Sequence, residues 1–477
     1  MSDNIKFTLN GKSVSADQSE TIWQVADRLD IEIPHLCHKP ADGYRPDGNC
    51  RACMVEIDGE RTLAASCIRK PIEGMVVSTT SERARRSREM VLELLVADQP
   101  SRKKAHDPDS TLWQFAEKAK LNKSRFPPHT APEPDSSHPA IAVNMDACIQ
   151  CGLCVRACRE IQVNDVIGMA GRGPNAHIVF DLGDDMGAST CVGCGECVQA
   201  CPTGALMPKT TLDDNGLLVH KPDRRVDSLC PYCGVGCQLT FNIKDDKIVS
   251  VDGRAGPANR GRLCIKGRYG FDYVHNPERL TVPLVRKENV SKEARIPSNP
   301  LDNFREASWE EALNQATAGL IKIRNRDGGT ALAGFGSAKG SNEEAYLVQK
   351  LVRTGFGTNN VDHCTRLCHA SSVAALMETI GSGAVTAPFA EAENAEVIIV
   401  IGANPTVNHP VAATFIKNAA KAGSTLIVMD PRGQALTRHA SYMIQFKPST
   451  DVALLNGMIN TIISEKLYDH QYVDGFT

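Results

Sequence analysis

The sequence predicts a multidomain chain of mixed class, in which small α+β modules precede the start of a doubly wound α/β domain. Three observations support this fold class. The chain has 477 residues, a length that favours roughly three domains with cores of their own. Sixteen of its 18 cysteines fall into four sets of four. After about residue 305, short apolar runs alternate with helical patterns, which is typical of a parallel sheet.

Composition and the chain's first residues exclude several classes of function. With 53 basic and 56 acidic residues the net charge is −3, which indicates neither nucleic-acid binding nor an anionic-membrane surface. No apolar run reaches spanning length, so membrane insertion is not expected, and no export signal is visible. We therefore expect a cytoplasmic protein. In a reducing cytosol, closely spaced thiols form no stable disulfide framework, so metal binding is the economical explanation.

Residues 1–78 predict a small mixed sheet with one helix. The β-type runs are IKFTLNG, ACMVEIDGE, RTLAASC and GMVVSTT, and the helical stretch is TIWQVADRL. Thr79 and Glu82 form an S/T-x-x-E signal for the start of a helix that leads into a connector over residues 79–137. Proline and polar residues from about 122 predict a linker at its end.

The first cysteine set lies within residues 1–78 and has the spacing C-x12-C-x2-C-x13-C. Four thiolates on such a loop can hold two irons. A structural zinc could use the same residues, but zinc sites more often show two C-x2-C pairs, so we favour a 2Fe–2S cluster. The candidate ligands are Cys37, Cys50, Cys53 and Cys67.

Residues 138–210 contain two C-x2-C-x2-C-x3-C runs, the repeat of bacterial two-cluster ferredoxins. In that arrangement the fourth cysteine of each run serves the other 4Fe–4S cluster. The second run ends in the usual proline, whereas the first has Arg159 there. We therefore assign one cluster to Cys148, Cys151, Cys154 and Cys201, and the second to Cys158, Cys191, Cys194 and Cys197.

The fourth set lies in residues 223–280 and consists of Cys230, Cys233, Cys237 and Cys264. From LCPYCGVGC onward the chain resembles the molybdopterin oxidoreductases, which open with one 4Fe–4S domain and bind two pterin–guanine dinucleotides. The resemblance implies that Lys266 bridges cluster and pterin. Residues 1–78, in turn, resemble the 2Fe–2S domain of the large complex I subunit and of related hydrogenases and formate dehydrogenases, which implies a β-grasp fold.

The stretch NNVDHCTRLCHASSVAAL resembles the part of the molybdopterin superfamily that contains the metal-binding cysteine or selenocysteine. The resemblance makes Cys368 a ligand of molybdenum or tungsten, metals that suit a soft thiolate. In formate dehydrogenases a histidine follows the ligand, as His369 does here. Cys364 is expected to be a small buried packing residue, because no partner thiol remains for it.

Four loops in residues 281–477 are candidates for contacts with the dinucleotides. GFGSAKG follows a predicted strand and precedes a helix, as phosphate-binding loops do, although it lacks G-x-G-x-x-G. By resemblance, GANPTVNHP, VMDPRG and KPSTDVALL serve the same cofactor. Ordinary turn chemistry is the alternative for each loop. The candidate residues are Gly336, Lys339, Asn342, Asn404, Asp430, Arg432 and Asp451.

The chain departs from the resemblance in two places. Relatives with this N-terminus usually hold a further 4Fe–4S cluster with H-x3-C-x2-C-x5-C. Here His106 is followed at those spacings by Ser110, Trp113 and Ala119, so this cluster should be absent and His106 should be a surface or capping residue. Family members also continue for roughly as long again, so residues 281–477 are expected to form an incomplete domain, and the 477-residue chain by itself is expected to be inactive.

The resemblance implies the α subunit of a NAD-linked formate dehydrogenase with one 2Fe–2S cluster, three 4Fe–4S clusters and a molybdenum or tungsten bis-(molybdopterin guanine dinucleotide). Formate would become CO2, and electrons would pass to a flavin- and NAD-binding iron–sulfur subunit in a hetero-oligomer. An electron-transfer scaffold like the large complex I subunit stays open, although Cys368, His369 and Lys266 argue against it. A nitrate-reducing relative is disfavoured by His369 and by the N-terminal modules.

Overall fold

The computed structural model describes residues 4–128, 132–293, 299–383 and 387–476. The chain forms two compact units, of which the larger comprises Met1–Phe271 and Pro388–Thr477 and the smaller Asp272–Ala387. Within the described ranges, no helix is both long and apolar enough to cross a membrane.

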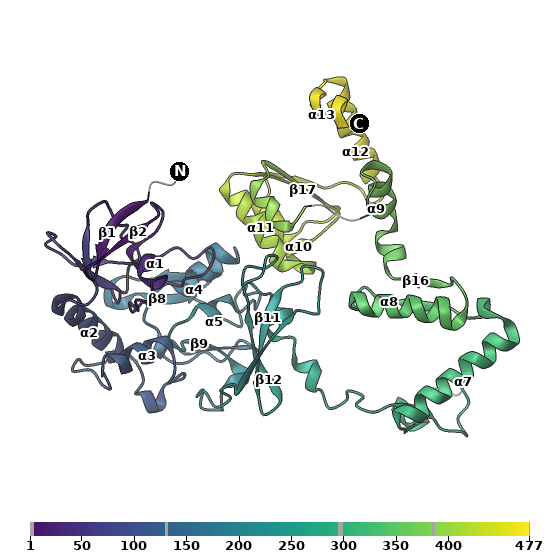
Figure 1. Cartoon of the computed structure of the whole chain (residues 1–477), viewed down its shortest axis with the longest axis horizontal. Coiled ribbons are helices and arrows are strands. Elements are labelled where there is room, and N and C mark those ends of the chain that lie inside the picture. The colour runs from purple at the N-terminus through teal and green to yellow at the C-terminus, as the bar shows by residue number, and fades with distance from the viewer. Residues whose placement is uncertain (1–3, 129–131, 294–298, 384–386, 477) are drawn as a thin grey trace. The chain divides into compact units, whose positions relative to one another are not determined.

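The N-terminal segment folds into a five-stranded mixed sheet with one helix, as its β-type runs predict (Figure 1). Strands β1 and β5 pair in parallel, and the remaining neighbours in the order β2-β1-β5-β3-β4 are antiparallel. Helix α1 begins after Thr21, which forms a reciprocal capping box with Gln24. The elements are β1 (Ile5–Leu9), β2 (Lys12–Ala16), α1 (Ile22–Asp27), β3 (Met54–Ile57), β4 (Ala64–Ala65) and β5 (Val76–Ser78).

The connector contains α2 (Glu82–Ala97) and α3 (Thr111–Lys118). Helix α2 begins at Glu82, but its cap is Ser81, whose hydroxyl accepts the N–H of Ala84 at 3.2 Å. The predicted cap, Thr79, is wrong because this residue directly follows the central strand β5 and is bonded to the turn after β1. Its N–H donates to the side chain of Asn10 at 2.7 Å.

Two antiparallel strand pairs and two short helices build the ferredoxin-like segment, and an antiparallel three-stranded sheet follows it. In the first, β6 pairs with β9 and β7 with β8, while a π-helical turn at Ala157–Ile161 extends α4. The elements are β6 (Ile141–Val143), α4 (Leu153–Arg156), β7 (Ile167–Ala170), β8 (His177–Phe180), α5 (Glu196–Ala200), β9 (Leu206–Pro208), β10 (Arg224–Leu229), β11 (Gln238–Lys244), β12 (Lys247–Gly253) and α6 (Ile265–Tyr269).

The α/β strands after residue 305 pair in parallel, as predicted, but the described residues do not join them in one sheet. In the smaller unit β15 pairs with β16, and in the larger unit β17, β18 and β19 form a separate three-stranded sheet. The smaller unit holds β13 (Leu284–Arg286), β14 (Phe304–Glu306), α7 (Trp309–Asp327), β15 (Gly334–Gly336), α8 (Asn342–Lys350), β16 (Val361–His363) and α9 (Thr365–Thr379).

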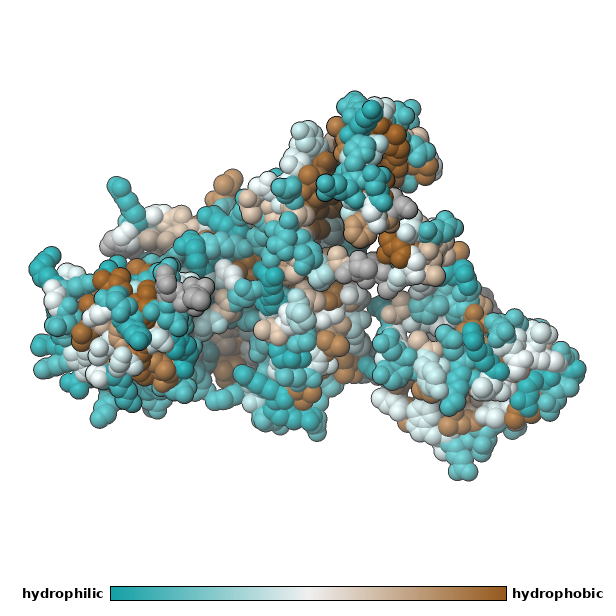
Figure 2. All heavy atoms as spheres, turned by 45° about the horizontal axis from the view of Figure 1, so that its top comes forward, coloured by the Kyte–Doolittle hydropathy of each residue, from teal (hydrophilic) through white to brown (hydrophobic). Residues whose placement is uncertain are grey.

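Helix α11 covers one face of the β17–β19 sheet and is the best-packed helix of this region, with residues such as Val411 and Phe415 fully buried (Figure 1). By contrast α7, α8, α9 and α12 bury no residue among those described. Figure 2 shows apolar surface toward the top of the view, over the C-terminal helices. The remaining elements are β17 (Val397–Ile401), α10 (Pro405–Asn408), α11 (Pro410–Ala422), β18 (Thr425–Met429), β19 (Tyr442–Ile444), α12 (Asp451–Ser464) and α13 (His470–Phe476).

Candidate metal and cofactor sites

The first cysteine set gathers where the loop before β3 meets the end of β4. Cys37, Cys53 and Cys67 are buried and Cys50 is half-buried. Hydrogen bonds from the thiols of Cys50 and Cys67 lower the pKa of Cys37, and one from Cys67 lowers the pKa of Cys53. The loop needs Gly48, whose φ is +65° and whose added Cβ would lie 2.7 Å from a side-chain atom of Ile68. The hydrogen bonds with Cys37 raise the pKa of Cys50 and Cys67, so two of the four cysteines favour the thiolate form that binds iron.

The eight ferredoxin-type cysteines surround two small cavities. Each cavity is lined by three cysteines of one run and the fourth cysteine of the other run, as the spacing predicts. Burial raises the pKa of Cys148 to about 11 and that of Cys194 to about 12. Four buried thiols around one hollow can become thiolates at neutral pH only beside strong positive charge, so the donor sets fit iron clusters. The first cavity has Cys148, Cys151, Cys154 and Cys201, and the second Cys158, Cys191, Cys194 and Cys197.

The fourth set lies at one end of the β10–β12 sheet. Cys230 follows β10 and its N–H donates to the carbonyl of Cys237 at 2.9 Å, while Cys264 directly precedes α6. Cys230, Cys233 and Cys264 pack against the apolar core that contains Cys237. Burial raises the pKa of Cys237 to about 12. The structure thus brings these four cysteines to one end of the sheet.

The second ferredoxin-type cavity lies directly against the module of the fourth set. The guanidinium of Arg268 in α6 donates to the carbonyl of Cys194 at 3.2 Å, and Gln162 donates to the carbonyl of Leu263 at 3.2 Å. A Cβ on Gly193 would lie only 2.8 Å from the side chain of Ile265. These contacts pack the two modules directly against each other.

The first ferredoxin-type cavity lies against the loop of the first set. Asn49 donates to the carbonyl of Cys151 at 3.3 Å. The buried guanidinium of Arg156 donates to the carbonyl of Cys37 at 2.6 Å and pairs with Asp47. Direct contacts between the modules therefore bring the four cysteine sets together within the larger unit.

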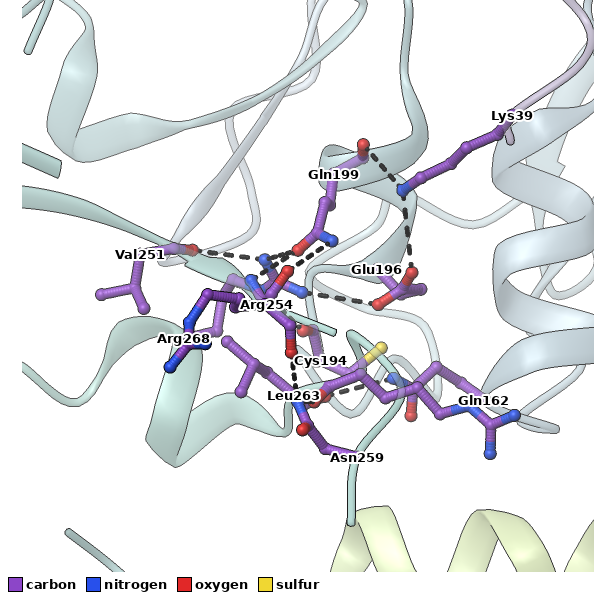
Figure 3. A network of polar contacts seen from close by, with 12 residues as sticks. Lys39, Gln162, Cys194, Glu196, Gln199, Val251, Arg254, Asn259, Leu263 and Arg268 are labelled. Carbon is purple, nitrogen blue, oxygen red and sulfur yellow. Dashed lines mark hydrogen bonds and ion pairs between the residues drawn. The ribbon is translucent and has the colours of Figure 1, made fainter. Parts of the chain in front are cut away.

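A buried polar network ties three modules together around Glu196, which stands between two cysteines of the second cavity (Figure 3). The hydroxyl of Tyr44 donates to Glu196 Oε1 at 2.8 Å, and Lys39 Nζ lies 4.0 Å from the same oxygen. On the other side Arg268 lies 3.5 Å from Glu196 Oε2. Sequence reasoning missed this network, because its members come from separate modules and show no common motif.

A cavity of about 850 Å³ opens beside the second ferredoxin-type cavity and the fourth cysteine set. Cys194, Cys264 and Lys266 form part of its wall. The loops after β17 and β18, at the carboxyl ends of parallel strands, supply much of the remainder, and open α/β sheets bind their ligands at this edge. Lys266 Nζ donates to the carbonyl of Val407 in one of these loops at 3.4 Å. The predicted lysine is therefore placed between the fourth set and a ligand-sized space.

In the loops after β17 and β18, the predicted residues form hydrogen bonds within the loop, and neighbouring residues of the same loops line the cavity. Asn404 accepts from the hydroxyl of Thr406 at 2.6 Å, and Asp430 accepts the N–H of Arg432 at 2.8 Å. Thr406 and Gln434 belong to the cavity wall. The turn chemistry that was the alternative for Asn404 and Asp430 is thus present, two residues from the wall at Asn404 and four at Asp430.

In the smaller unit, the GFGSAKG loop meets the start of α9. Gly336 pairs with His363 across the parallel strands, and the N–H of Ala338 donates to Cys364 Sγ at 3.3 Å. The expectation that Cys364 is buried is wrong, because it is exposed and stands at the N-cap of α9, where it receives this bond. Cys368 is exposed in the first turn of α9, and His369 follows it, half-buried.

The other dinucleotide candidates lie in two places. Lys339 is part of the same loop as Gly336, and Asn342 begins α8 directly after its cap, Ser341. Asp451 is in the first turn of α12, which belongs to the larger unit. Gly336, Lys339 and Asn342 lie close to one another within the smaller unit.

His106 is largely buried, so the expected surface or capping role is wrong. Its Nε2 lies 2.9 Å from Asp146 Oδ1 and its Nδ1 lies 2.7 Å from the carbonyl oxygen of Gly216. Burial lowers the pKa of His106, but the hydrogen bonds to Asp146 and Gly216 together raise it above its usual value. Both ring nitrogens face acceptors, which fits an imidazolium. Ser110 and Trp113, at two cysteine positions of the relatives' motif, are buried.

Four family models match successive parts of the chain. Residues 2–82 match a 2Fe–2S iron–sulfur cluster binding domain and residues 147–205 a 4Fe–4S dicluster domain. Residues 223–276 match the Fe4S4 domain of the molybdopterin oxidoreductases, and residues 279–472 match the molybdopterin oxidoreductase model itself.

Two curated proteins of Bacillus subtilis (strain 168) align over nearly the whole chain. The one named "Probable oxidoreductase YjgC" is 29% identical over 98% of this chain and 50% of its own length. The one named "Putative formate dehydrogenase YrhE" is 30% identical over 99% of this chain and 51% of its own length. The chain spans about half the length of the curated relatives it matches.

Among solved structures, a chain of an NAD+-reducing NiFe-hydrogenase is 30% identical, with a TM-score of 0.40 over 43% of this chain and 87% of that chain. The domain matches and the order of the cysteine sets agree along the sequence. The chain thus carries a 2Fe–2S domain and a 4Fe–4S dicluster domain ahead of two domains that match the molybdopterin oxidoreductase family.

Proposed function

We propose that the protein is the catalytic α subunit of a cytoplasmic formate dehydrogenase that oxidises formate to CO2. Its electrons would pass through one 2Fe–2S and three 4Fe–4S clusters to a flavin-containing partner subunit that reduces NAD. The observation that carries formate as the substrate is Cys368 followed by His369 at the start of α9, beside the GFGSAKG loop. The name of the relative YrhE supports the same substrate.

Cys368 is proposed to hold molybdenum or tungsten, and two pterin–guanine dinucleotides would complete that centre. When bound, this group would supply the two-electron redox chemistry. His369, adjacent to the ligand, would orient formate or handle its proton. The loops of Gly336, Lys339, Asn342, Asn404, Asp430, Arg432 and Asp451 are proposed to hold the dinucleotides.

Lys266 is proposed to stabilise an electron that leaves the pterin for the cluster of the fourth set. Its ammonium group lies in the wall of the 850 Å³ cavity, two residues from Cys264. A positive charge at this place stabilises the extra electron on either side of it.

The order of the cysteine sets supports the 2Fe–2S site as an outlet to a partner, in preference to a side branch. The fourth set lies against the second ferredoxin-type cavity, and the first ferredoxin-type cavity lies against the loop of Cys37. We propose that the set of Cys37 stands at the end of the series opposite Lys266. An electron-accepting subunit is expected to bind there.

The test uses the protein isolated without oxygen from its own cells, together with any chains that co-purify. A formate dehydrogenase contains molybdenum or tungsten with pterin and reduces a dye with formate. A scaffold that only transfers electrons contains the iron but neither the metal nor pterin, and that result would contradict the proposal. Cys368→Ala should abolish formate-dependent dye reduction and retain the iron. The matched control is Glu378→Gln, exposed near the other end of the same helix.

A further inference from the structure

Three basic side chains from the C-terminal α/β segment donate hydrogen bonds to residues 159–164, the short stretch of chain that follows Cys158. Lys417 and Lys421 lie on α11, and Arg438 lies in the 3-10 turn Ala435–His439. Lys421 Nζ donates to the carbonyl of Arg159 at 3.1 Å. Lys417 and Arg438 bind further along this stretch, at Gln162, Val163 and Asn164.

Lys417 makes the most complete set of these bonds. Its Nζ donates to the carbonyl of Gln162 at 2.6 Å, to the carbonyl of Val163 at 3.2 Å and to the side-chain oxygen of Asn164 at 3.1 Å. All three acceptors are neutral. The ammonium group is thus held in one position by a full set of acceptors, and its charge is not cancelled by them.

Residues 159–164 lie directly beside the second ferredoxin-type cavity. The N–H of Asn164 donates to the carbonyl of Cys158 at 2.9 Å, and Asn164 lines this cavity together with Cys158. On its other side, Lys417 lines the 850 Å³ cavity together with Cys194. The ammonium group of Lys417 therefore binds Asn164, a residue in the wall of the cavity that four cysteines surround.

Lys417 is a buried charge, with 6% of its surface exposed. Burial and the nearby Arg438 lower the pKa of Lys417 to about 8, while Cys194, Cys158 and the carboxylate of Asp165 act in the opposite direction. The group is therefore mainly protonated at neutral pH. Arg268, the other buried cation beside this cavity, differs because it is paired with Glu196.

We propose that Lys417 raises the reduction potential of the 4Fe–4S cluster that Cys158, Cys191, Cys194 and Cys197 hold. One-electron reduction adds one negative charge to the cluster and its cysteines. A fixed cation in a poorly screened place stabilises the reduced form more than the oxidised form, which raises the potential. Lys417 is a tuning residue and touches neither substrate nor cluster. The inference rests on the proposed cluster assignment.

This position gives the tuning a role in the proposed electron path. The cluster concerned stands next to the fourth cysteine set and so receives electrons early in the series. The cation comes from the α/β segment, which also forms much of the wall of the 850 Å³ cavity. The potential of this cluster is thus set by the segment that builds the candidate cofactor site.

The test is a redox titration of the 477-residue chain, purified without oxygen and followed by electron paramagnetic resonance. The signal of this cluster is the one that Cys191→Ser alters. Lys417→Gln keeps donors for the bonded oxygens but removes the charge, so we expect its midpoint potential to fall while the other signals keep theirs. Lys417→Arg should retain the wild-type potential. Lys421→Gln is the matched control, because this exposed lysine one turn further along α11 is screened by solvent.

Three other results of this titration would contradict a part of the proposal. An unshifted potential in Lys417→Gln, with its iron content intact, would overturn the tuning and leave the proposed function standing. If Lys417→Gln loses the cluster, Arg438→Gln replaces it, with a smaller fall expected and no fall contradicting the inference. A wild-type chain without any signal that depends on Cys191 would overturn the cluster assignment and the tuning together.

Discussion

Single residues decide the role of the connector segment around His106, where the resemblance predicts the loss of a cluster. At the place where relatives use a histidine and three cysteines, His106 bonds Asp146 and Gly216, while Ser110 and Trp113 are buried. The retained histidine thus joins the connector to the ferredoxin-like segment through hydrogen bonds. It has a structural role at a position that the resemblance assigns to a ligand.

We predict that His106→Ala destabilises the chain in a pH-dependent way. The pKa of His106 is raised in the folded state, so its contribution is complete below the unfolded pKa of about 6.5 and is lost as the pH rises through the raised value. Hydrogen bonds to a charged group suggest a loss of roughly 1–2 kcal/mol at pH 6. Urea midpoints of the variant and wild type should approach each other by pH 9. His177→Ala, on an exposed strand position, is the control, and a gap that widens with pH would contradict the prediction.

We also predict a large effect for the buried pair of Glu196 and Arg268, whose side chains are 3% and 2% exposed. Glu196→Gln leaves the guanidinium buried without a countercharge, which typically costs about 3–5 kcal/mol. Denaturant unfolding of the iron-loaded chain measures the loss. The exposed pair of Arg85 and Glu89 is the control, and Glu89→Gln should change the stability by at most about 0.5 kcal/mol. Equal effects of the two variants would show that burial has no influence here.

At the scale of elements, sequence patterns within short stretches predicted the structure well, whereas contacts between distant residues could not be predicted. The cysteine runs predicted which thiols share a cavity, because the spacing within each run limits where its sulfurs can reach. The alternation of strands and helices likewise predicted parallel pairing. The role of Lys417 could not be predicted, since its partner Gln162 is 255 positions away. Cys364 was misplaced because burial depends on the tertiary contacts of α9, which its sequence does not specify.

The helices of the α/β region differ in packing, and we predict that they differ in stability. Residues of α11 are buried throughout its length, whereas α7, α8, α9 and α12 bury none of the described residues. Amide hydrogen exchange in the 477-residue chain should be at least about a hundredfold slower in α11, a difference of roughly 3 kcal/mol in opening free energy. Similar protection of α11 and α7 would contradict this expectation. Addition of any co-purifying chain should slow exchange in the helices that it covers.

At the scale of the whole molecule, the four cysteine sets predict the iron content. One 2Fe–2S and three 4Fe–4S clusters correspond to about 14 irons per chain. A colorimetric iron assay on protein purified without oxygen measures this number. A value near 18 would show that His106 supports a further cluster after all. Cys230→Ser should lower the content toward about 10 without changing the signals of the ferredoxin-type clusters.

Each ferredoxin-type cavity takes one cysteine from the other run, and this exchange has a consequence for how the clusters are assembled and lost. Cys158 and Cys201 each stand in one run and face the cavity of the other. Damage that pulls either cysteine away therefore disturbs both cavities at once. The two clusters are expected to be inserted during maturation, and destroyed by oxygen, as a pair. The middle of the proposed electron path would then be either complete or absent, and half-built chains that leak electrons would be rare.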